Sequence, residues 1–481
     1  MLVNGIDHAR LSGAESVLEM ICAAARTHAD RIAVTCGTRS ISYADMMAAA
    51  NANAVRLAAC GVAPRDMVLC ALSTGVELPL AWLSVMIAGA VIVPIDARWP
   101  AMRLQAVVAA TGARLAIGDG ADNAALAATG LQLYGIDVEL PVGQADAGVA
   151  PPTGADLLYG FFTSGSTGTP KCALNHHAGL VNRFSYMTRR FGQGHVVYQN
   201  SAPLFDSSIW QMLWPLTGGS VSVLPERRDH WDIDTVVADI SRHGISMTDF
   251  VPTLFKLLVR ALENGSVAPV RLASLRNVLI GGEEIDPASV HTFRRLMPRC
   301  RIINTYGHTE ASIGMVFHEV RDEDGEHIPL GRPIDNTYVR IVDADMKTMP
   351  EGEFGEMAVA GICVGAGYLN MPELSARAFV PNPFRDLPGE LVYRTGDIGR
   401  VRADGMLEYG GRTDDQVKVR GVRIELGEVS LAMKACFPQV QDAMAVVVPN
   451  SGATPAWRWP TRHRLRSTCA SCGGTCRGTC R

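Results

Sequence analysis

Apolar and polar positions alternate along the first half of the chain in blocks that predict helices and strands in turn. Apolar residues recur at helical spacing over residues 44–59 and 81–88. Short, continuous apolar runs, which are typical of buried strands, occupy residues 68–72, 91–94 and 115–117. Since helices that alternate with strands usually cover parallel sheets, this half predicts an α/β fold with largely parallel strands.

The pattern changes near Gly331. Beyond it, short strands separated by frequent Gly, Asp and Pro predict a β-rich subdomain that includes residues 339–342, 355–360 and 407–409. Residues 411–427 then combine charge with glycine, which is the composition expected of a connector between two bodies.

The composition suits a globular protein and argues against two classes of partner. Hydrophobic residues make up 48% and charged residues 19% of the 481 residues, and the net charge is −4. No basic field therefore indicates a nucleic acid or a membrane surface. Residues 78–95 are an uncharged run about as long as a short membrane span, but Pro79, Gly89 and Pro94 interrupt it, so a buried helix followed by a buried strand explains it better. Residues 1–10 lack a signal-peptide pattern, and we expect a cytoplasmic protein.

A loop rich in hydroxyl groups, glycine and lysine follows the apolar run at residues 157–162. It consists of Thr163, Ser164, Gly165, Ser166, Thr167, Gly168, Thr169, Pro170 and Lys171. Glycines let backbone N–H groups turn toward one point, and the hydroxyls and the ammonium add donors around it, which suits a polyphosphate. The spacing is not that of a P-loop, and a plain surface loop is the alternative. The apolar strand that leads into the loop favours a nucleotide site.

A series of motifs in order, from about residue 15 to about residue 448, resembles the adenylate-forming enzymes, and within them the amino-acid adenylation domains of nonribosomal peptide synthetases. Besides the loop at 163–171, these motifs are residues 41–45, 88–96, 205–208, 304–310, 355–369, 393–397 and 411–428. His308 stands where the family usually has proline.

The resemblance implies a fold and a domain organisation. A large N-terminal domain at residues 1–412 would contain two α/β sheet subdomains and a β-rich, barrel-like subdomain. A hinge and an incomplete small α+β domain would occupy residues 413–450, and a tail outside the family pattern residues 451–481.

The activity implied is the attack of an amino-acid carboxylate on the α-phosphorus of ATP, which gives aminoacyl-AMP and pyrophosphate. The amino acid would then pass to the phosphopantetheine thiol of a peptidyl carrier protein. An acyl- or aryl-acid ligase, or a remnant that binds ligands without catalysis, are the alternatives. The absence of a recognisable condensation or carrier domain favours a stand-alone or chain-initiating role.

The resemblance also assigns roles around ATP. The loop at 163–171 would hold the β- and γ-phosphates, Thr309 would contact the α-phosphate, and Glu310 would bind Mg²⁺, a cation that prefers oxygen ligands. Lys418 is assigned to the catalytic residues, on a face that the small domain presents when it turns about the hinge at Asp414. The remaining nucleotide-binding residues would be Asn304, Tyr306, Asp397, Tyr409 and Arg412, of which Asp397 would accept both ribose hydroxyls.

In the amino-acid pocket, Asp206 would pair with the substrate α-ammonium, which a ligase of plain acids would not need. The resemblance adds Ser207, Trp210, Asp249, Leu279, Gly281, Thr305, Ile313 and Gly314 to the pocket lining. A buried carboxylate without a partner is costly, so Asp249 should meet a cation or hydrogen-bond donors on the substrate. We therefore predict a substrate with a polar side chain, a class that includes the basic side chains.

The tail departs from the family. Lys434 is the last lysine of the sequence, whereas the family places a catalytic lysine some tens of residues later. We expect adenylation by this form to be impaired as a result. Cysteines 469, 472, 476 and 480 have spacings compatible with zinc, but the residues between them supply no core. A shifted reading frame is the interpretation we prefer, because permissible codons restore a family-like sequence over residues 468–480.

Overall fold

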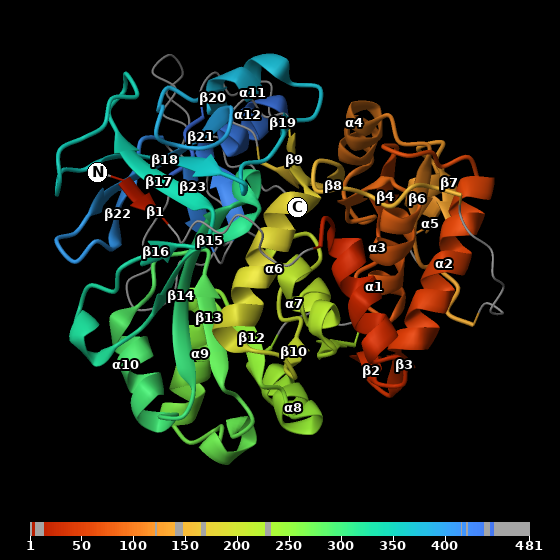
Figure 1. Ribbon diagram of the computed structural model, residues 1–481, viewed down its shortest axis with the longest axis horizontal. Coiled ribbons are helices and arrows are strands. Elements are labelled where there is room, and N and C mark those ends of the chain that lie inside the picture. The colour runs from red at the N-terminus through yellow and green to blue at the C-terminus, as the bar shows by residue number, and fades with distance from the viewer. Residues whose placement is uncertain are drawn as a thin grey trace, which may run out of the picture.

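The computed structural model describes residues 2–4, 14–120, 123–139, 148–164, 170–226, 232–414, 416–419, 422–436 and 443–446. Two large sheets with helices, a third sheet built from antiparallel strands and a small two-stranded sheet make up this part of the chain (Figure 1).

The first α/β unit, in red to orange at the right of Figure 1, is built on a seven-stranded sheet with the order β19-β9-β8-β5-β4-β6-β7. Its strands are β4 (Met67–Cys70), β5 (Val91–Pro94), β6 (Leu115–Ile117), β7 (Gln132–Tyr134), β8 (Leu157–Thr163), β9 (Lys171–His176) and β19 (Gly367–Tyr368). Strands β4 to β8 pair in parallel, while β9 and β19 are antiparallel to their neighbours. Its helices are α2 (Tyr43–Ala59), α3 (Glu77–Ile87), α4 (Ala101–Thr111) and α5 (Asn123–Ala127).

The second unit is a nine-stranded sheet with the order β16-β15-β14-β13-β12-β10-β11-β2-β3. Its strands are β2 (Ile32–Cys36), β3 (Arg39–Ser42), β10 (Val196–Tyr198), β11 (Val221–Leu224), β12 (Met247–Phe250), β13 (Asn277–Gly281), β14 (Arg301–His308), β15 (Ile313–Glu319) and β16 (Arg332–Pro333). Its helices are α1 (Val17–Thr27), α6 (His177–Phe191), α7 (Ser207–Leu213), α8 (Ile233–His243), α9 (Pro252–Glu263) and α10 (Pro287–Leu296). Short 3-10 turns occupy Pro215–Gly218, Pro269–Leu272, Thr309–Ala311 and Asp322–Asp324.

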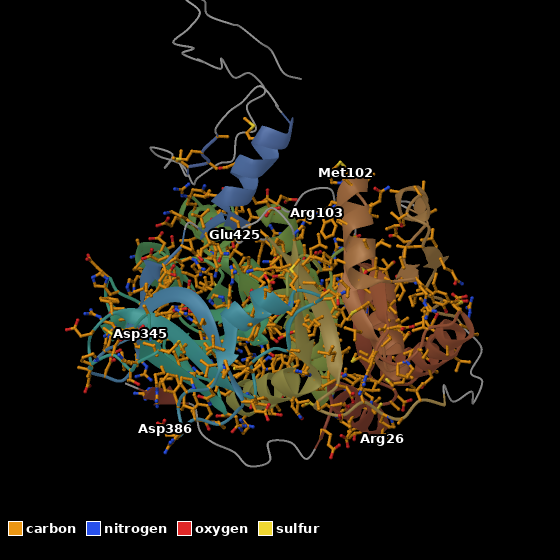
Figure 2. All side chains as sticks on the ribbon, turned by 90° about the horizontal axis from the view of Figure 1, so that it is seen from above. Arg26, Met102, Arg103, Asp345, Asp386 and Glu425 are labelled. Atoms are coloured by element: carbon orange, nitrogen blue, oxygen red, sulfur yellow. The ribbon has the colours of Figure 1, made fainter. Side chains whose placement is uncertain are left out.

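The third unit is a six-stranded antiparallel sheet in which β1 (Leu2–Asn4), β17 (Thr337–Val342), β18 (Gly355–Gly361), β21 (Leu391–Val401) and β20 (Phe379–Pro381) follow one another, with β22 (Leu407–Arg412) on β21. Helix α11 (Pro372–Ala378) lies beside it. The hairpin of β23 (Gln416–Val419) and β24 (Val422–Glu425) leads into α12 (Leu426–Cys436). Figure 2 shows α12 standing off from the body, with Glu425 at its base.

One hydrophobic core joins the two α/β units, and α6 lies within it. The apolar face of α6 repeats at helical spacing through Leu180, Phe184 and Met187, all of which are buried. This packing fixes α6 between the sheets and carries one arginine of the same face, Arg183, into the interior.

The fold predicted from the sequence is confirmed. Strands β5 and β6 have the predicted bounds, and the helix expected at residues 44–59 is α2, which starts one residue earlier. The uncharged run at 78–95 divides into α3 and β5, as predicted. Among the helices that the structure describes, none is long and apolar enough to span a membrane. The tail and its cysteines lie outside the described residues.

Candidate active site

The site is organised by a sharp turn between β14 and β15. A bulge at Tyr306 and Gly307 is followed by the 3-10 turn Thr309–Ala311. Ser312 and Ile313 then have φ values of 56° and 74°, which side-chain-bearing residues rarely adopt. Gly307 is required here, because a Cβ atom would lie 1.9 Å from the Ile313 carbonyl oxygen. Strain of this kind concentrates at functional sites, and here it directs Glu310 into the interior.

Glu310 meets two groups from the first α/β unit. Its Oε1 accepts a hydrogen bond of 2.8 Å from the Tyr368 hydroxyl and lies 3.6 Å from Lys171 Nζ. Lys171 Nζ is also 3.3 Å from the Tyr368 hydroxyl and lies over its ring. Glu310 is fully buried and Lys171 nearly so. The cluster therefore combines a carboxylate that suits Mg²⁺ with an ammonium that suits phosphate, next to the sequence-predicted phosphate loop.

Tyr368 belongs to a motif of the sequence, but we assigned it no role there. Replacement by phenylalanine should weaken the apparent affinity for Mg²⁺–ATP by about tenfold, because Glu310 loses the hydroxyl that orients it. The KM for the amino acid should change little. Initial rates of pyrophosphate exchange at varied Mg²⁺–ATP check this, and equal changes in both KM values would indicate a general structural role instead.

Asp397, at an irregularity in the pairing of β21 with β18, is the centre of a second cluster. Its Oδ2 accepts hydrogen bonds from the Tyr306 hydroxyl at 2.7 Å and from His308 Nε2 at 2.8 Å, and its Oδ1 pairs with Arg412. Burial would raise the pKa of Asp397, but His308, together with Arg412 and Lys418, outweighs burial and holds that pKa well below its usual range. The carboxylate is thus kept charged, as an acceptor for hydroxyl groups requires.

Arg412 links this cluster to the predicted hinge. Besides Asp397, it binds Asp414 with Nε and Nη2, at 2.6 and 2.8 Å. Tyr409, on the same strand β22, is half-exposed, and burial together with Asp397 raises its pKa to about 12. Four of the predicted nucleotide-binding residues, Tyr306, Asp397, Tyr409 and Arg412, are therefore close together, and Arg412 pairs directly with Asp414, the predicted hinge residue.

Asp206 lies immediately before α7 and contacts the turn Thr309–Ala311. Burial raises its pKa, while a hydrogen bond from the Thr309 side chain and the charges of Arg183 and Lys418 act in the opposite direction. Thr309 thus contacts Asp206, and its neighbour Glu310 contacts Lys171. The two carboxylates predicted to bind the substrate ammonium and the metal are connected through one turn.

Asp249, on β12, has partners within the protein. Ser201 Oγ donates to Asp249 Oδ1 at 3.1 Å, and the Trp210 side chain donates a second hydrogen bond. Burial raises the pKa of Asp249 to about 7, although these donors and Arg183 oppose it. The sequence predicts that the substrate supplies donors for Asp249, whereas the fold itself supplies several of them.

Asp249→Asn should raise the melting temperature at about pH 8 by a few degrees, because it removes a carboxylate whose charge burial disfavours. The unfolded-state pKa is about 3.9, and the folded-state pKa is about 7. Since the folded-state value is the higher one, Asp249 costs the wild type stability progressively as the pH rises from about 4 to about 7. The gain from Asn should therefore shrink toward about pH 4. Thermal unfolding across this range checks it, and a lower melting temperature at about pH 8 would contradict it.

Arg183, on α6, is a site residue that the sequence analysis missed. Its guanidinium donates through Nη1 to the carbonyl oxygen of Gly314 and lies 5.2 Å from the centre of the Phe317 ring. Only 2% of its surface is exposed. The sequence signal was available, since Arg183 is a charge on the apolar face defined by Leu180, Phe184 and Met187.

The structure gives the other predicted site residues contacts within the protein. Their contacts are Ser207 Oγ to Ser201 Oγ at 2.9 Å, Thr305 Oγ1 to the Ile280 carbonyl at 3.2 Å, Asn304 Nδ2 to the Pro329 carbonyl at 2.8 Å and Thr163 Oγ1 to the Lys171 carbonyl at 3.4 Å. Leu279 and Ile313 are buried, and a Cβ atom on Gly281 would lie 2.5 Å from the Thr305 carbonyl oxygen. Ser164 is partly buried. Gly165, Ser166, Thr167 and Gly168 lie outside the described residues.

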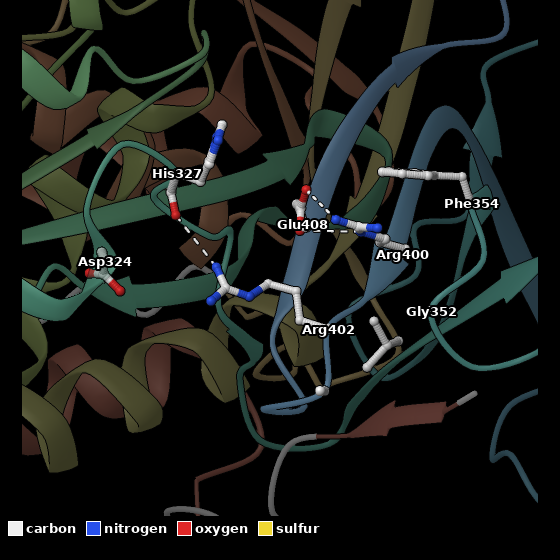
Figure 3. A pocket seen from close by; sticks show the side chains of 9 residues that line it. Asp324, His327, Gly352, Phe354, Arg400, Arg402 and Glu408 are labelled. Carbon is white, nitrogen blue, oxygen red and sulfur yellow. Dashed lines mark hydrogen bonds and ion pairs between the residues drawn. The ribbon is translucent and has the colours of Figure 1, made fainter.

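A separate hollow of about 790 Å³ lies beside β21 and β22 (Figure 3). Arg400 pairs with Glu408 at 3.1 Å and covers the ring of Phe354, and Arg402 donates to the His327 carbonyl at 3.4 Å. None of the predicted site residues lines it. Arg400 pairs with Glu408 inside the hollow, whereas Arg402 pairs with Asp404 and Asp324 with His318. We therefore place the active site at the β14–β15 turn and not in this hollow.

Comparisons with known proteins show the family of the chain. The family model described as AMP-binding enzyme matches residues 22–369. Phosphinothricin tripeptide synthetase PhsB of Streptomyces viridochromogenes is 34% identical over 454 residues, which cover 92% of this chain and 37% of that protein. Enterobactin synthase component F of Escherichia coli (strain K12) is 34% identical over 426 residues, which cover 86% of this chain and 32% of that protein. The chain thus spans about a third of the length of these relatives.

Solved structures have the same fold. Holo-PA1221, a nonribosomal peptide synthetase protein containing adenylation and PCP domains, superposes with a TM-score of 0.78 at 25% identity, over 88% of this chain and 73% of that one. The nonribosomal peptide synthetase FmoA3 superposes with a TM-score of 0.75 at 29% identity, over 83% of this chain and 43% of that one. The resemblance drawn from the sequence motifs is confirmed: the chain belongs to the AMP-binding enzyme family and, within it, is similar to the adenylation domains of nonribosomal peptide synthetases.

Proposed function

We propose that the chain uses ATP to activate an amino acid as aminoacyl-AMP, with release of pyrophosphate. One observation carries the proposal: the turn Thr309–Ala311 joins both halves of the site. Thr309 reaches Asp206, the candidate partner of the α-ammonium, and Glu310 reaches Lys171, the candidate partner of phosphate. An amino acid whose ammonium pairs with Asp206 would therefore direct its carboxylate toward the polyphosphate.

The chemistry is a displacement at phosphorus between two anions. An oxygen of the amino-acid carboxylate forms a bond to the α-phosphorus, and the bond to the bridging oxygen breaks as pyrophosphate leaves. The residues neutralise charge and fix positions: Lys171 counters the phosphates, Thr309 contacts the α-phosphate, and Asp206 holds the ammonium. Mg²⁺ on Glu310, when bound, would spread the charge that develops on the phosphate oxygens.

Asp397 is proposed to hold the nucleoside by accepting its ribose hydroxyls. Its lowered pKa keeps it charged, and Tyr306, His308 and Arg412 fix its orientation. Tyr306, whose hydroxyl is taken up by Asp397 and whose ring packs edge-on to His308, is proposed to lie along the adenine.

The second half-reaction is proposed to be transfer of the aminoacyl group to the phosphopantetheine thiol of a peptidyl carrier protein. Lys418 supports a role for the small domain, since its charge acts on the pKa of both Asp206 and Asp397. Asp414 is the proposed hinge, and Arg412 would release it when the small domain turns. The substrate is proposed to carry a polar side chain, because Asp249 lies among the predicted pocket residues.

Amino-acid-dependent ATP–pyrophosphate exchange on this chain, over a full amino-acid panel, tests the proposal. Exchange that depends on one amino acid or a small group supports it. Exchange with plain acids only would point to an acyl- or aryl-acid ligase. ATP binding without exchange would indicate a binding-only form, or adenylation impaired as expected from the departure of residues 451–481 from the family.

A further inference from the structure

A buried cation lies at the amino-acid pocket. Arg183 projects from α6, and its Nη1 donates to the carbonyl oxygen of Gly314, a predicted pocket residue. Its Nε has no hydrogen-bond partner among the residues that the structure describes. A buried donor without a partner costs free energy, because it has lost its hydrogen bonds to water. A ligand group that accepts from this guanidinium would replace a hydrogen bond that was lost on folding.

The pocket is shaped around this side chain. A Cβ atom on Gly314 would lie 2.7 Å from Arg183 Nη1 and 3.4 Å from its Cζ, so a glycine at 314 leaves room for the guanidinium. Phe317, three residues later on β15, covers the guanidinium with its ring. Because the predicted pocket residue Gly314 has no side chain, it leaves space, and the guanidinium of Arg183 occupies that space.

Arg183 is one positive charge next to two carboxylates. Asp206 and Asp249 are its acidic neighbours, and their charges act on its pKa, which burial nonetheless lowers to about 10. If Asp206 pairs with the substrate ammonium, Arg183 is left to compensate Asp249. A second cation, on the side chain of the substrate, would then find both carboxylates already paired with a positive charge. It would also face the positively charged Arg183.

We propose that Arg183 is a specificity-determining residue of this pocket, and that with Asp249 it selects an amino acid whose side chain is neutral and both donates and accepts hydrogen bonds, such as a carboxamide or a hydroxyl. The inference rests on the proposed function and narrows it, since it removes the basic side chains that the sequence analysis allowed. A neutral polar group can donate to Asp249 and accept from Arg183, which satisfies both without adding charge.

Binding of stable aminoacyl-adenylate mimics tests the inference without requiring catalysis. The probes are aminoacyl sulfamoyl adenosines of glutamine, asparagine, serine, threonine, glutamate, lysine and leucine, titrated calorimetrically into the full chain. We expect the best neutral polar probe to bind at least about thirtyfold more tightly than the lysine probe, since a like charge in a closed pocket is strongly rejected. A preference for the lysine, glutamate or leucine probe would overturn the inference.

Two variants separate selection from structure. Arg183→Met removes the charge and frees Asp249, so the lysine probe should gain about tenfold relative to the best neutral probe. Gly314→Ala keeps the charge but crowds Nη1, and it should weaken the preferred probe while sparing ATP. The matched control is Arg190→Met, on the same helix, whose partner is Glu319 at 3.3 Å and which should leave the order of probes unchanged.

The outcomes distinguish this inference from the proposed function. Side-chain discrimination with a basic preference, or an equal change for every probe in Arg183→Met, would overturn the inference alone. Binding of ATP with no binding of any probe would overturn the inference and the proposed function together.

Discussion

Glu310→Gln should reduce amino-acid-dependent ATP–pyrophosphate exchange by about a hundredfold to a thousandfold, the scale of losing one principal charge-stabilising group. Glutamine preserves the shape of the side chain and its contact with Tyr368, but it removes the negative charge that would hold Mg²⁺. It also leaves the nearly buried Lys171 without its counter-charge. The loss should be expressed in kcat and in the KM for Mg²⁺–ATP, with the KM for the amino acid little changed.

Exchange assays on the variant and on Glu353→Gln, an exposed loop substitution, provide the comparison. The control should retain wild-type exchange. Because Lys171 loses its partner, thermal unfolding should be recorded alongside, so that a folding defect is not mistaken for a catalytic one. Wild-type exchange in a folded Glu310→Gln protein would contradict the assignment of Glu310 to the metal.

Asp206→Asn should raise the KM for the amino acid by about a hundredfold, because a desolvated ammonium–carboxylate contact is lost in a closed pocket. The KM for ATP should remain within about twofold, since Asp397 and Lys171 are untouched. Equal losses for both substrates would argue that Asp206 supports the Thr309 turn and does not bind the ammonium.

The pH dependence gives a second readout of the same residue. Burial raises the pKa of Asp206 in the free protein, and an ammonium binds only to the ionised carboxylate. As the pH falls through that raised pKa, a growing fraction of Asp206 is protonated. The wild-type KM for the amino acid should therefore increase toward acidic pH, whereas that of Asp206→Asn should lose this dependence.

The cluster around Asp397 would connect the proposed nucleotide site to the proposed hinge. Arg412 contacts Asp397 and Asp414 at once, and His308 occupies the position where the family usually has proline. A ribose bound at Asp397 would compete with Arg412, which also holds Asp414. With this geometry, the rotation of the small domain would depend on whether the nucleotide site is occupied.

The candidate residues of the site could be proposed from the sequence because they belong to contiguous motifs. Thr309, Glu310, Asp397 and Asp206 each lie in a short run whose spacing is readable along the chain. The same applies to β5 and β6, whose continuous apolar runs between polar segments left little choice of structure or bounds. In each case, the information lies within a few residues of the position predicted.

The partners of those residues could not be found in this way. Tyr368 meets Lys171 across 197 positions of sequence, and Arg183 meets Gly314 across 131. Such contacts arise only when the sheets pack on one another and α6 is fixed between them. Asp249 is the clearest case: as a sequence position it is a carboxylate in need of a partner, and only the fold surrounds it with Ser201, Trp210 and Arg183.

The sequence by itself determined the alternation of helices and strands, the change to a β-rich unit and the motifs that carry the chemistry, because periodicity and local spacing are properties of neighbouring residues. Only the tertiary structure decided which charges compensate one another. Burial raises the cost of every unpaired charge, and its partner is whichever group the packing brings within a few ångströms, regardless of its distance along the chain.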